Sequence, residues 1–365
     1  MTAQREMSER QDIGDRQEAH RSAARDARLR YVGEHERGFT RRRHGRGFGY
    51  GDTRGERVTD PEERERLTAL VIPPAWNDVW ICRDARGHIQ ATGRDEAGRK
   101  QYIYHTRWHE IRDRAKFEHL VAFGTSLPAI RRRLRRDLRD DLLSRQRLIA
   151  AIVKLMDATL IRVGNATYAR ANGSFGLTTL REEHVRANGD EIVFDFVGKG
   201  GTRHELSVRD EELAAIVRSC QEIPGHELFH YLDAEGVPRT VDSSDVNDYL
   251  RSVTERDVTA KDFRTWGGTV LTARALHAQR DAASLTARKR SVVASIREVA
   301  GTLGNTPAVC RRAYVHPLVI EHYLEGSFHD DYDRALEVAR RRRPRELRLH
   351  EAAALGYLER AAARP

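Results

Sequence analysis

The sequence predicts an α+β protein in which a small β-rich N-terminal domain precedes a larger, mainly α-helical domain that contains one β-hairpin. Three observations lead to this prediction. Short β-prone runs separated by turn residues follow one another up to Tyr104, apolar residues at helical spacing dominate after Trp108, and two further β-prone runs flank a glycine-rich turn at 198–201. We therefore expect four parts in chain order: a flexible arm (1–27), the β-rich domain (28–106), the helical domain (107–345) and a C-terminal helical tail (346–365).

The composition is that of a basic protein with enough residues for two domains. Its 365 residues include 64 Lys and Arg against 55 Asp and Glu, which gives a formal net charge of +9. A basic balance favours a polyanionic partner such as nucleic acid, although charge alone is a weak argument. The three cysteines show no CxxC spacing, which argues against a disulfide framework and against a zinc site. Since we find no long apolar run and no signal-peptide core, we expect a cytoplasmic protein without membrane contact.

The N-terminal segment changes character twice. Residues 1–27 are polar and charged without an apolar period, which is typical of a flexible arm. The stretch 40–51 is basic and glycine-rich, and it lacks the strand-then-helix context that its GxG spacing would need in a dinucleotide site. Arginines mixed with Phe48 and Tyr50 suit a phosphate backbone better, with a solvated flexible loop as the alternative.

Three short β-prone runs predict a small antiparallel sheet in the N-terminal domain. The runs are 79–82, 88–92 and 101–104, and the turns between them are 84–87 and 95–98.

Two helices are expected at the start of the helical domain. Ser126 ahead of Pro128 resembles a helix N-cap with proline near the first turn, so we expect a helix over 129–138. A second amphipathic helix is expected over 143–161, ended by Gly164.

The predicted β-hairpin, formed by 191–197 and 203–208, carries a lysine at its tip. Lys199 is flanked by Gly198, Gly200 and Gly201. Glycines permit close approach of the backbone to a ligand, so this lysine can follow an anionic substrate into a groove. An ordinary exposed turn lysine is the alternative, and the pattern is not a P-loop.

Two arginines and a tyrosine complete the set of candidate residues. Arg162 follows an apolar helix, so its charge needs an anionic partner, either a structural carboxylate or a ligand. Arg264 has Asp262 nearby as a structural partner, and Tyr314, which ends a helix that begins at Thr306–Pro307, would on its own be a core-edge residue. Scattered cations and a phenol, without a metal motif, are what transesterification at a phosphodiester needs. Together the residues therefore point to cutting and rejoining of nucleic acid.

In their order along the chain, these segments resemble type IB DNA topoisomerases of the small poxviral and bacterial form. The resemblance covers residues 28–325. Its segments are Ile72–Trp76 and Gly93–Tyr102 in the β-rich domain, then Ile161–Gly164, Phe196–Lys199, Lys261–Thr265, Leu303–Pro307 and Arg312–Tyr314.

The resemblance implies a catalytic role for four residues. Tyr314 would attack a backbone phosphate and leave a 3′-phosphotyrosyl bond and a free 5′-hydroxyl. Arg162 and Arg264 would bind the non-bridging oxygens, and Lys199 would be the general acid that protonates the departing 5′-oxygen. Elementary chemistry agrees, because a phenol with a pKa of about 10 needs cations beside it and an alkoxide leaves poorly unless protonated. Since the phosphotyrosine keeps the bond energy, neither ATP nor a metal is expected.

Asn305 departs from the family pattern, in which many members have histidine at this position. An amide N–H donates to a phosphate oxygen but has no ionisable proton near neutral pH. We therefore expect Asn305 to hydrogen-bond the transition state, while a proton-transfer role for it is in doubt. His316 is expected to be a helix-end residue and not the missing histidine. Lys261 is a secondary candidate, for a phosphate contact or as a relay to the leaving oxygen.

The resemblance also implies that the two domains close around duplex DNA as a clamp. The protein would act as a nucleoid-associated monomer without a small-molecule cofactor. For the β-rich domain, a sheet edge with ordinary surface charges is the alternative. The residues of this domain that we expect to contact DNA are Arg41, Arg42, Arg43, Arg99, Lys100, Gln101 and Tyr102.

Two other functions stay open at this point. A tyrosine recombinase shares the helical catalytic domain and the Arg/Lys/Arg/Tyr chemistry. Recombinases usually have His-x-x-Arg where this chain has lysine at 261 before Arg264, and the β-rich domain also argues against this class. The second alternative is a non-enzymatic DNA-binding protein with a degenerate site.

Overall fold

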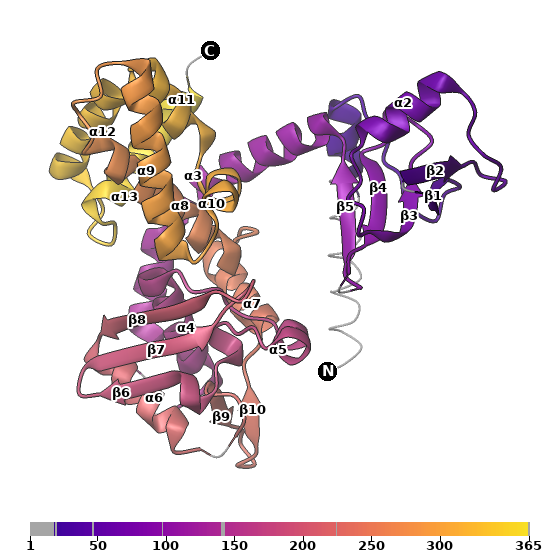
Figure 1. The fold of residues 1–365 in the computed structure, drawn as a ribbon. Coiled ribbons are helices and arrows are strands. Elements are labelled where there is room, and N and C mark those ends of the chain that lie inside the picture. Colours follow the sequence, from indigo (N-terminus) through magenta and orange to yellow (C-terminus); the bar gives the residue numbers. More distant parts are fainter. Residues whose placement is uncertain are drawn as a thin grey trace. The chain divides into compact units, whose positions relative to one another are not determined.

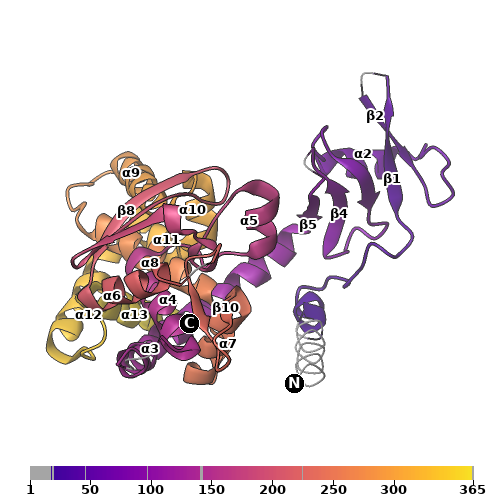
Figure 2. The ribbon, with the colours of Figure 1, turned by 90° about the horizontal axis from the view of Figure 1, so that it is seen from below.

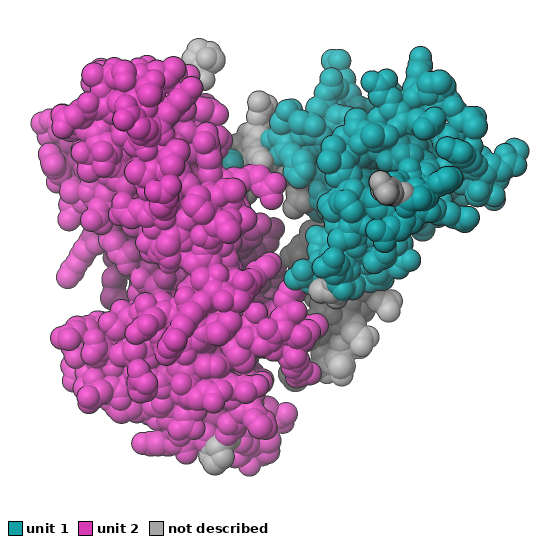
Figure 3. Space-filling model, in the orientation of Figure 1, with its two compact units in different colours: residues 1–118 teal, residues 119–365 magenta. Residues whose placement is uncertain are grey.

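The computed structural model describes residues 18, 20–45, 47–96, 98–139, 143–223 and 225–363. The chain divides into two compact units, residues 1–118 and 119–365, which Figure 3 distinguishes by colour. Antiparallel strands dominate the first unit and helices the second, so the predicted α+β fold class is confirmed (Figure 1). No helix within the described ranges is long and apolar enough to cross a membrane.

The first unit is built on one antiparallel sheet with strand order β2-β1-β3-β4-β5. The predicted strands and turns between residues 79 and 104 are confirmed, because β3, β4 and β5 pair in sequence. Leu67 of a short helix, Ile81 and Ala91 are fully buried in the apolar core beneath the sheet. The elements are β1 (Phe39–His44), β2 (Gly47–Gly51), α2 (Pro61–Ala69), β3 (Asn77–Ile81), β4 (Ile89–Arg94) and β5 (Lys100–Tyr104).

The basic, glycine-rich stretch is a hairpin and not a flexible loop. Strands β1 and β2 pair from Thr40 opposite Gly51 to His44 opposite Gly47. This hairpin extends beyond the other strands of the sheet (Figure 2). Glycines occupy alternate positions of β2 and leave one face of the strand without side chains. Because glycine is uncommon in strands, this stretch carries no clear strand signal in its sequence.

Only the end of the segment 1–27, which was expected to be a flexible arm, can be compared with the structure. Residues 1–17 and 19 lie outside the described residues. Residues 20–26 are helical, in contrast to the expectation, and Ala24 and Ala27 are buried beside Leu29 and Trp108. Small alanines among charged residues give no visible apolar period, so this contact with Trp108 could not be predicted from the local pattern.

One long helix, α3 (Thr106–Asp137), replaces the shorter helix that was predicted to begin near Ser126. Ser126 does not cap a helix: its hydroxyl donates to the carbonyl of Ala122 at 2.8 Å, one turn back. Pro128 lies inside the helix, where it removes one backbone hydrogen bond. Phe123, Leu127 and Ile130 are fully buried on both sides of this proline, and their burial holds the helix together. The domain boundary expected between residues 106 and 107 falls inside α3, where the helix is continuous. The boundary stays a prediction.

In the second unit, a three-stranded sheet with its covering helices and a group of C-terminal helices form two layers (Figure 1). The predicted hairpin is confirmed as β7 and β8, which pair from Glu191 opposite Arg209 to Val197 opposite Arg203. The predicted C-terminal helix is confirmed as α13, and its Tyr357 is buried. The first group of elements is α4 (Arg145–Thr159), α5 (Ala166–Asn172), η1 (Leu177–Thr179), η2 (Glu182–His184), β6 (Val185–Asn188), β7 (Glu191–Val197), β8 (Arg203–Arg209), α6 (Glu211–Gln221), β9 (His230–Leu232), β10 (Pro238–Thr240) and α7 (Ser243–Thr254). The second is α8 (Ala260–His277), α9 (Leu285–Leu303), α10 (Pro307–Tyr314), α11 (Pro317–Glu325), α12 (Phe328–Arg342) and α13 (Leu349–Ala362).

Helix α4 ends earlier than predicted, and the way it ends matters for the site. The helix was predicted to run to residue 161, but its C-cap is Leu160, which adopts the left-handed conformation with φ 57°. A leucine is strained there, but its side chain packs against the bare backbone of Gly267 in α8. That contact fixes the direction of the Leu160 carbonyl and of the chain that leads to Arg162.

Candidate active site

Arg264 is a buried cation held by the ends of two helices. Its side chain extends from α8 and the residue is only 4 % exposed. One terminal nitrogen donates to the carbonyl of Leu160 at the end of α4, and the other donates to the carbonyl of Leu303 at the end of α9, at 2.7 Å. Helix C-termini carry partial negative charge, so both contacts favour a guanidinium here.

Arg264 is nevertheless short of negative charge. Its Nε has no acceptor among the residues that the structure describes, and Asp262 does not pair with it there. Burial and the nearby charge of Arg162 lower the pKa of Arg264 to about 10. The guanidinium is therefore still charged at neutral pH, in a setting that an added anion would stabilise.

Arg162 lies in the extended segment that follows α4. Its backbone carbonyl accepts from Leu177 at 2.9 Å, and the next residue is likewise tied to η1, so the segment is fixed in place. The side chain donates to the amide oxygen of Asn305 at 2.5 Å. The structural carboxylate that we considered as its partner is replaced, within the described part of the chain, by this neutral amide.

Asn305 follows the left-handed Gly304 that ends α9. Its backbone N–H donates to the carbonyl of Ala300 at 2.9 Å, which closes the helix end. Its amide nitrogen lies 3.4 Å from the carbonyl of Leu303, the same carbonyl that accepts from Arg264. One helix end thus orients both arginines.

Tyr314 is the last residue of α10, a helix that begins as predicted. Thr306 caps it by accepting from the backbone N–H of Val309, and Pro307 occupies the first turn. The end of α10 approaches α8 closely, because a Cβ on Gly268 would come within 2.6 Å of the Tyr314 carbonyl oxygen. Glycine at 268 is therefore required for this packing.

The phenol of Tyr314 lies next to positive charge. The guanidinium carbon of Arg264 is 4.9 Å from the centre of its ring. Burial of Tyr314 by itself would raise the phenol's pKa, but the charges of Arg264 and Arg162 and hydrogen bonds from both outweigh burial, so the pKa lies below its ordinary value of 10.0. The arginines thus favour the ionised, nucleophilic form.

Lys199 stands at the tip of the β7–β8 hairpin and is exposed. Its ammonium lies 5.5 Å from the centre of the Tyr168 ring on α5. Lys261, in the first turn of α8, is also exposed. Residues from five separate segments line one pocket of about 350 Å³, and among them are Arg162, Lys199, Lys261, Arg264 and Tyr314.

The structure therefore brings together the six residues predicted to carry the chemistry. Five line this pocket, and Asn305 contacts Arg162 directly. His316 is not part of the group; it caps the start of α11, as expected for a helix-end residue. Two neighbours were missed by the sequence analysis, Tyr168 in the pocket and His204 on β8, because neither lies in a recognisable motif.

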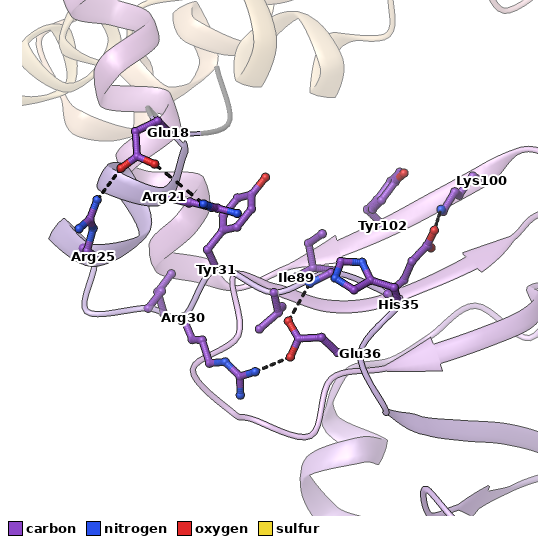
Figure 4. Close-up of a pocket in the computed structure, with 14 residues that line it drawn as sticks. Glu18, Arg21, Arg25, Arg30, Tyr31, His35, Glu36, Ile89, Lys100 and Tyr102 are labelled. Carbon is purple, nitrogen blue, oxygen red and sulfur yellow. Dashed lines mark hydrogen bonds and ion pairs between the residues drawn. The ribbon is translucent and has the colours of Figure 1, made fainter. Parts of the chain in front are cut away.

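The residues predicted to contact DNA in the first unit are mostly paired within it. Asp95 accepts from both Arg99 and Gln101 at 2.9 Å, and Glu34 pairs with Lys100. Tyr102 is exposed, and its ring stacks on that of Tyr104, two residues further along β5. Figure 4 shows Lys100 and Tyr102 in the wall of a pocket that is also lined by Tyr31, His35 and Glu36.

Arg41 differs from its two neighbours in the hairpin. Its guanidinium donates to the carbonyls of Ile72, Pro73 and Trp76 at 2.7, 2.9 and 2.8 Å, and it covers the ring of Phe48. These three acceptors give Arg41 a structural role within the unit, and the phosphate contact expected of it stays a prediction. Arg42 and Arg43 are exposed.

Comparison with known proteins covers most of the chain. Residues 105–333 match the family model of the eukaryotic DNA topoisomerase I catalytic core, and residues 47–95 match that of the bacterial DNA topoisomerase IB N-terminal domain. DNA topoisomerase 1B of Acanthamoeba polyphaga mimivirus is 31% identical over 275 residues, which are 73% of this chain and 82% of the viral protein. DNA topoisomerase 1B of vaccinia virus (strain Copenhagen) is 24% identical over 274 residues, which are 73% of this chain and 83% of that protein. These matches confirm the resemblance seen in the sequence.

Proposed function

Because the chain belongs to the type IB DNA topoisomerases, we propose that it relaxes supercoiled duplex DNA by cutting one strand through Tyr314 and rejoining it, without ATP or metal. The observation that supports this proposal most strongly is that one pocket is lined by a phenol of lowered pKa together with two arginines and two lysines. A phosphodiester placed there would meet a nucleophile, charge stabilisation and an acid at once.

Cleavage is an in-line exchange of one ester bond for another. The Tyr314 phenol loses its proton to solvent, and its oxygen forms a bond to phosphorus as the bond from phosphorus to the 5′-oxygen breaks. Lys199 gives a proton to that departing oxygen, which becomes a free 5′-hydroxyl. The strand stays attached through a 3′-phosphotyrosyl bond, so the reverse exchange rejoins it without an external energy source.

Arg162 and Arg264 would hold the two non-bridging oxygens of the phosphate. Arg264 suits this role because its burial without a carboxylate leaves its charge poorly balanced until a phosphate arrives. Asn305 would orient Arg162 through its amide oxygen and donate its N–H to the phosphate. Lys261 would supply a further phosphate contact or relay a proton toward Lys199.

Duplex DNA is the proposed partner of both units. In the first unit we assign DNA contacts to Arg42, Arg43 and the segment 99–102 at the start of β5. There Arg99, Lys100 and Gln101 would exchange their carboxylate partners for phosphates or base edges. In the second unit the pocket with Tyr314 would receive the scissile phosphate. The clamp arrangement, the monomeric state and the nucleoid location also stay proposals.

The test is relaxation of plasmid DNA by the purified protein in EDTA without ATP, together with trapping on a nicked suicide duplex. We expect relaxation, a covalent adduct on the peptide that contains Tyr314, and loss of both in Tyr314→Phe with duplex binding nearly unchanged. A Tyr314→Phe protein that still forms the adduct would refute the proposal. Strand exchange between paired sites in place of relaxation would point to a recombinase.

A further inference from the structure

His204 is a histidine near the pocket that the proposed mechanism does not use. It lies on β8 directly opposite Phe196 on β7, and the two rings stack with 5.0 Å between their centres and 12° between their planes. Phe196 is almost fully buried, so it is a rigid platform for the imidazole. The histidine ring is thereby held in one orientation beside the turn that carries Lys199.

The edges of this imidazole fill the space beside two glycines that neighbour residues of the site. A Cβ on Gly198 would lie 2.7 Å from the ring atoms Cδ2 and Nε2, and a Cβ on Gly304 would lie 2.3 Å from Cε1. Gly198 precedes Lys199, and Gly304 precedes Asn305. The histidine is therefore a wedge between the base of the lysine turn and the end of α9.

The lysine turn needs such a support. Gly200 and Gly201 both have positive φ, 81° and 74°, and a Cβ on either would meet nothing within 4 Å. Glycines lose more conformational freedom on ordering than other residues, so a turn with three of them holds its lysine loosely unless something fixes its base. A general acid must lie within hydrogen-bond reach of the leaving oxygen to act.

The charge state of His204 indicates how it acts. Burial, and then the charges of Arg162 and Arg264, keep the pKa of the imidazole below its ordinary value of 6.5. At neutral pH the ring is therefore uncharged and adds nothing to the positive field of the site. Its contribution is its shape.

We propose that His204 is a positioning residue for strand cleavage, which braces the turn of Lys199 by packing edge-on between Gly198 and Gly304. This inference rests on the proposed function, in which Lys199 is the acid. It assigns a role to a residue that would neither touch the DNA nor transfer a proton.

The first test compares two substrates with the same scissile site, one with the natural 5′-oxygen and one with a 5′-thio leaving group. Sulfur leaves without protonation, so a defect that acts through the acid shrinks on the thio substrate. For His204→Ala we expect single-turnover cleavage of the oxygen substrate to fall by up to about 100-fold, as for a misplaced catalytic group, with most of the loss recovered on the thio substrate. Equal losses on both substrates would overturn the inference.

Lys199→Ala on the same two substrates separates the inference from its premise. If the thio substrate rescues Lys199→Ala but not His204→Ala, the acid assignment stands and only the bracing role fails. If it rescues neither, Lys199 is not the acid, and both the assignment and the inference fall.

A second test keeps His204 and changes Gly198, the glycine against which the imidazole packs. Gly198→Ala puts a methyl group 2.7 Å from two atoms of the imidazole, while the next nearest atom belongs to Phe196 at an ordinary contact distance of 3.6 Å. We expect Gly198→Ala to slow cleavage of the oxygen substrate, and the double variant with His204→Ala to be no slower than His204→Ala alone. Losses that multiply in the double variant would contradict the proposed contact.

His350 provides the matched control. It is another half-buried imidazole of the second unit, and it stacks at 12° on Tyr332 away from the pocket. His350→Ala should show how much thermal stability is lost when a packed histidine is removed. The ratio of the cleavage rates on the thio and oxygen substrates should stay that of the parent protein. A ratio that rises as much in His350→Ala as in His204→Ala would show that general loosening, not bracing of Lys199, causes the effect.

Discussion

The guanidinium of Arg264 lies against the ring of Tyr314, with 4.9 Å between its central carbon and the ring centre. The arginine also holds the carbonyls of Leu160 and Leu303, so it cannot move toward the phenol or away from it without leaving a helix end unsatisfied. The packing of α8 against α4 and α9 thus fixes the arginine that lowers the pKa of the Tyr314 phenol.

Replacement of Arg264 by lysine should be severe although the charge is kept. A lysine cannot reach two carbonyls and face the phosphate at once, because its ammonium is a single point on a flexible stem. We expect cleavage to slow by about 10²- to 10³-fold, the usual effect of removing a group that stabilises the transition state. Arg274→Lys, an exposed substitution on the same helix, is the control and should leave the cleavage rate unchanged.

The titration of Tyr314 gives a prediction with a definite sign. Its pKa in the folded protein is below 10.0, because the arginines outweigh burial. The folded state therefore releases this proton at lower pH than the unfolded state, and the stability from the ionised phenol is full above the unfolded pKa and is lost as pH falls through the folded one. Ultraviolet titration should show one tyrosine that ionises early in the parent protein. An early transition that persists in Tyr314→Phe would contradict the assignment.

Asn305→His should keep activity. An imidazole can accept from Arg162 and donate to a phosphate oxygen, which are the two interactions assigned to the amide. A loss of more than about a hundredfold in cleavage rate, or ~2.7 kcal/mol, would instead mean that the pocket is shaped around the amide. Asn305→Ala should be the slower variant of the two, since it leaves Arg162 without its acceptor.

Glu34→Gln should strengthen duplex binding. Glu34 pairs with Lys100, which would otherwise be free to contact a phosphate. Lys100→Ala should weaken binding to all sequences and reduce the slope of log affinity against log salt by about 1. Asp233→Asn, which frees Arg239 from a similar ion pair in the turn between β9 and β10, is the control and should not change affinity. If Glu34→Gln behaves like this control, Lys100 does not bind DNA.

Arg131 is expected to be the most important ion-pairing residue for the stability of the second unit. It is 11% exposed and pairs with Asp157 at 2.8 Å and with Glu351 at 2.7 Å, which joins α3, α4 and α13. Arg131→Ala removes the closest cation of Asp157 and of the buried Glu351 and leaves each of them only the exposed Arg348. It should lower the free energy of unfolding by about 3–5 kcal/mol in urea titrations. Arg341→Ala removes an exposed pair with Glu337 and should change it by less than about 1 kcal/mol.

Features that depend on neighbours in the chain were predictable from the sequence. The β7–β8 hairpin follows from two β-prone runs around a glycine turn, and the start of α10 follows from Thr306 and Pro307. The set of chemical residues could be chosen because their order along the chain resembles a family, and comparison with known proteins confirms that family. What the residues do individually is still a proposal.

Features that depend on contacts across the fold needed the structure. Helix α3 continues through Pro128 because distant apolar residues cover both sides of the break, and Arg41 binds carbonyls that no local pattern places beside it. Arg264 receives its acceptors from the ends of α4 and α9, and His204 fits between glycines of two other segments. Local preference and spacing determine which elements form, but the charge and room around a side chain are set by segments far away in sequence, and only their packing brings them together.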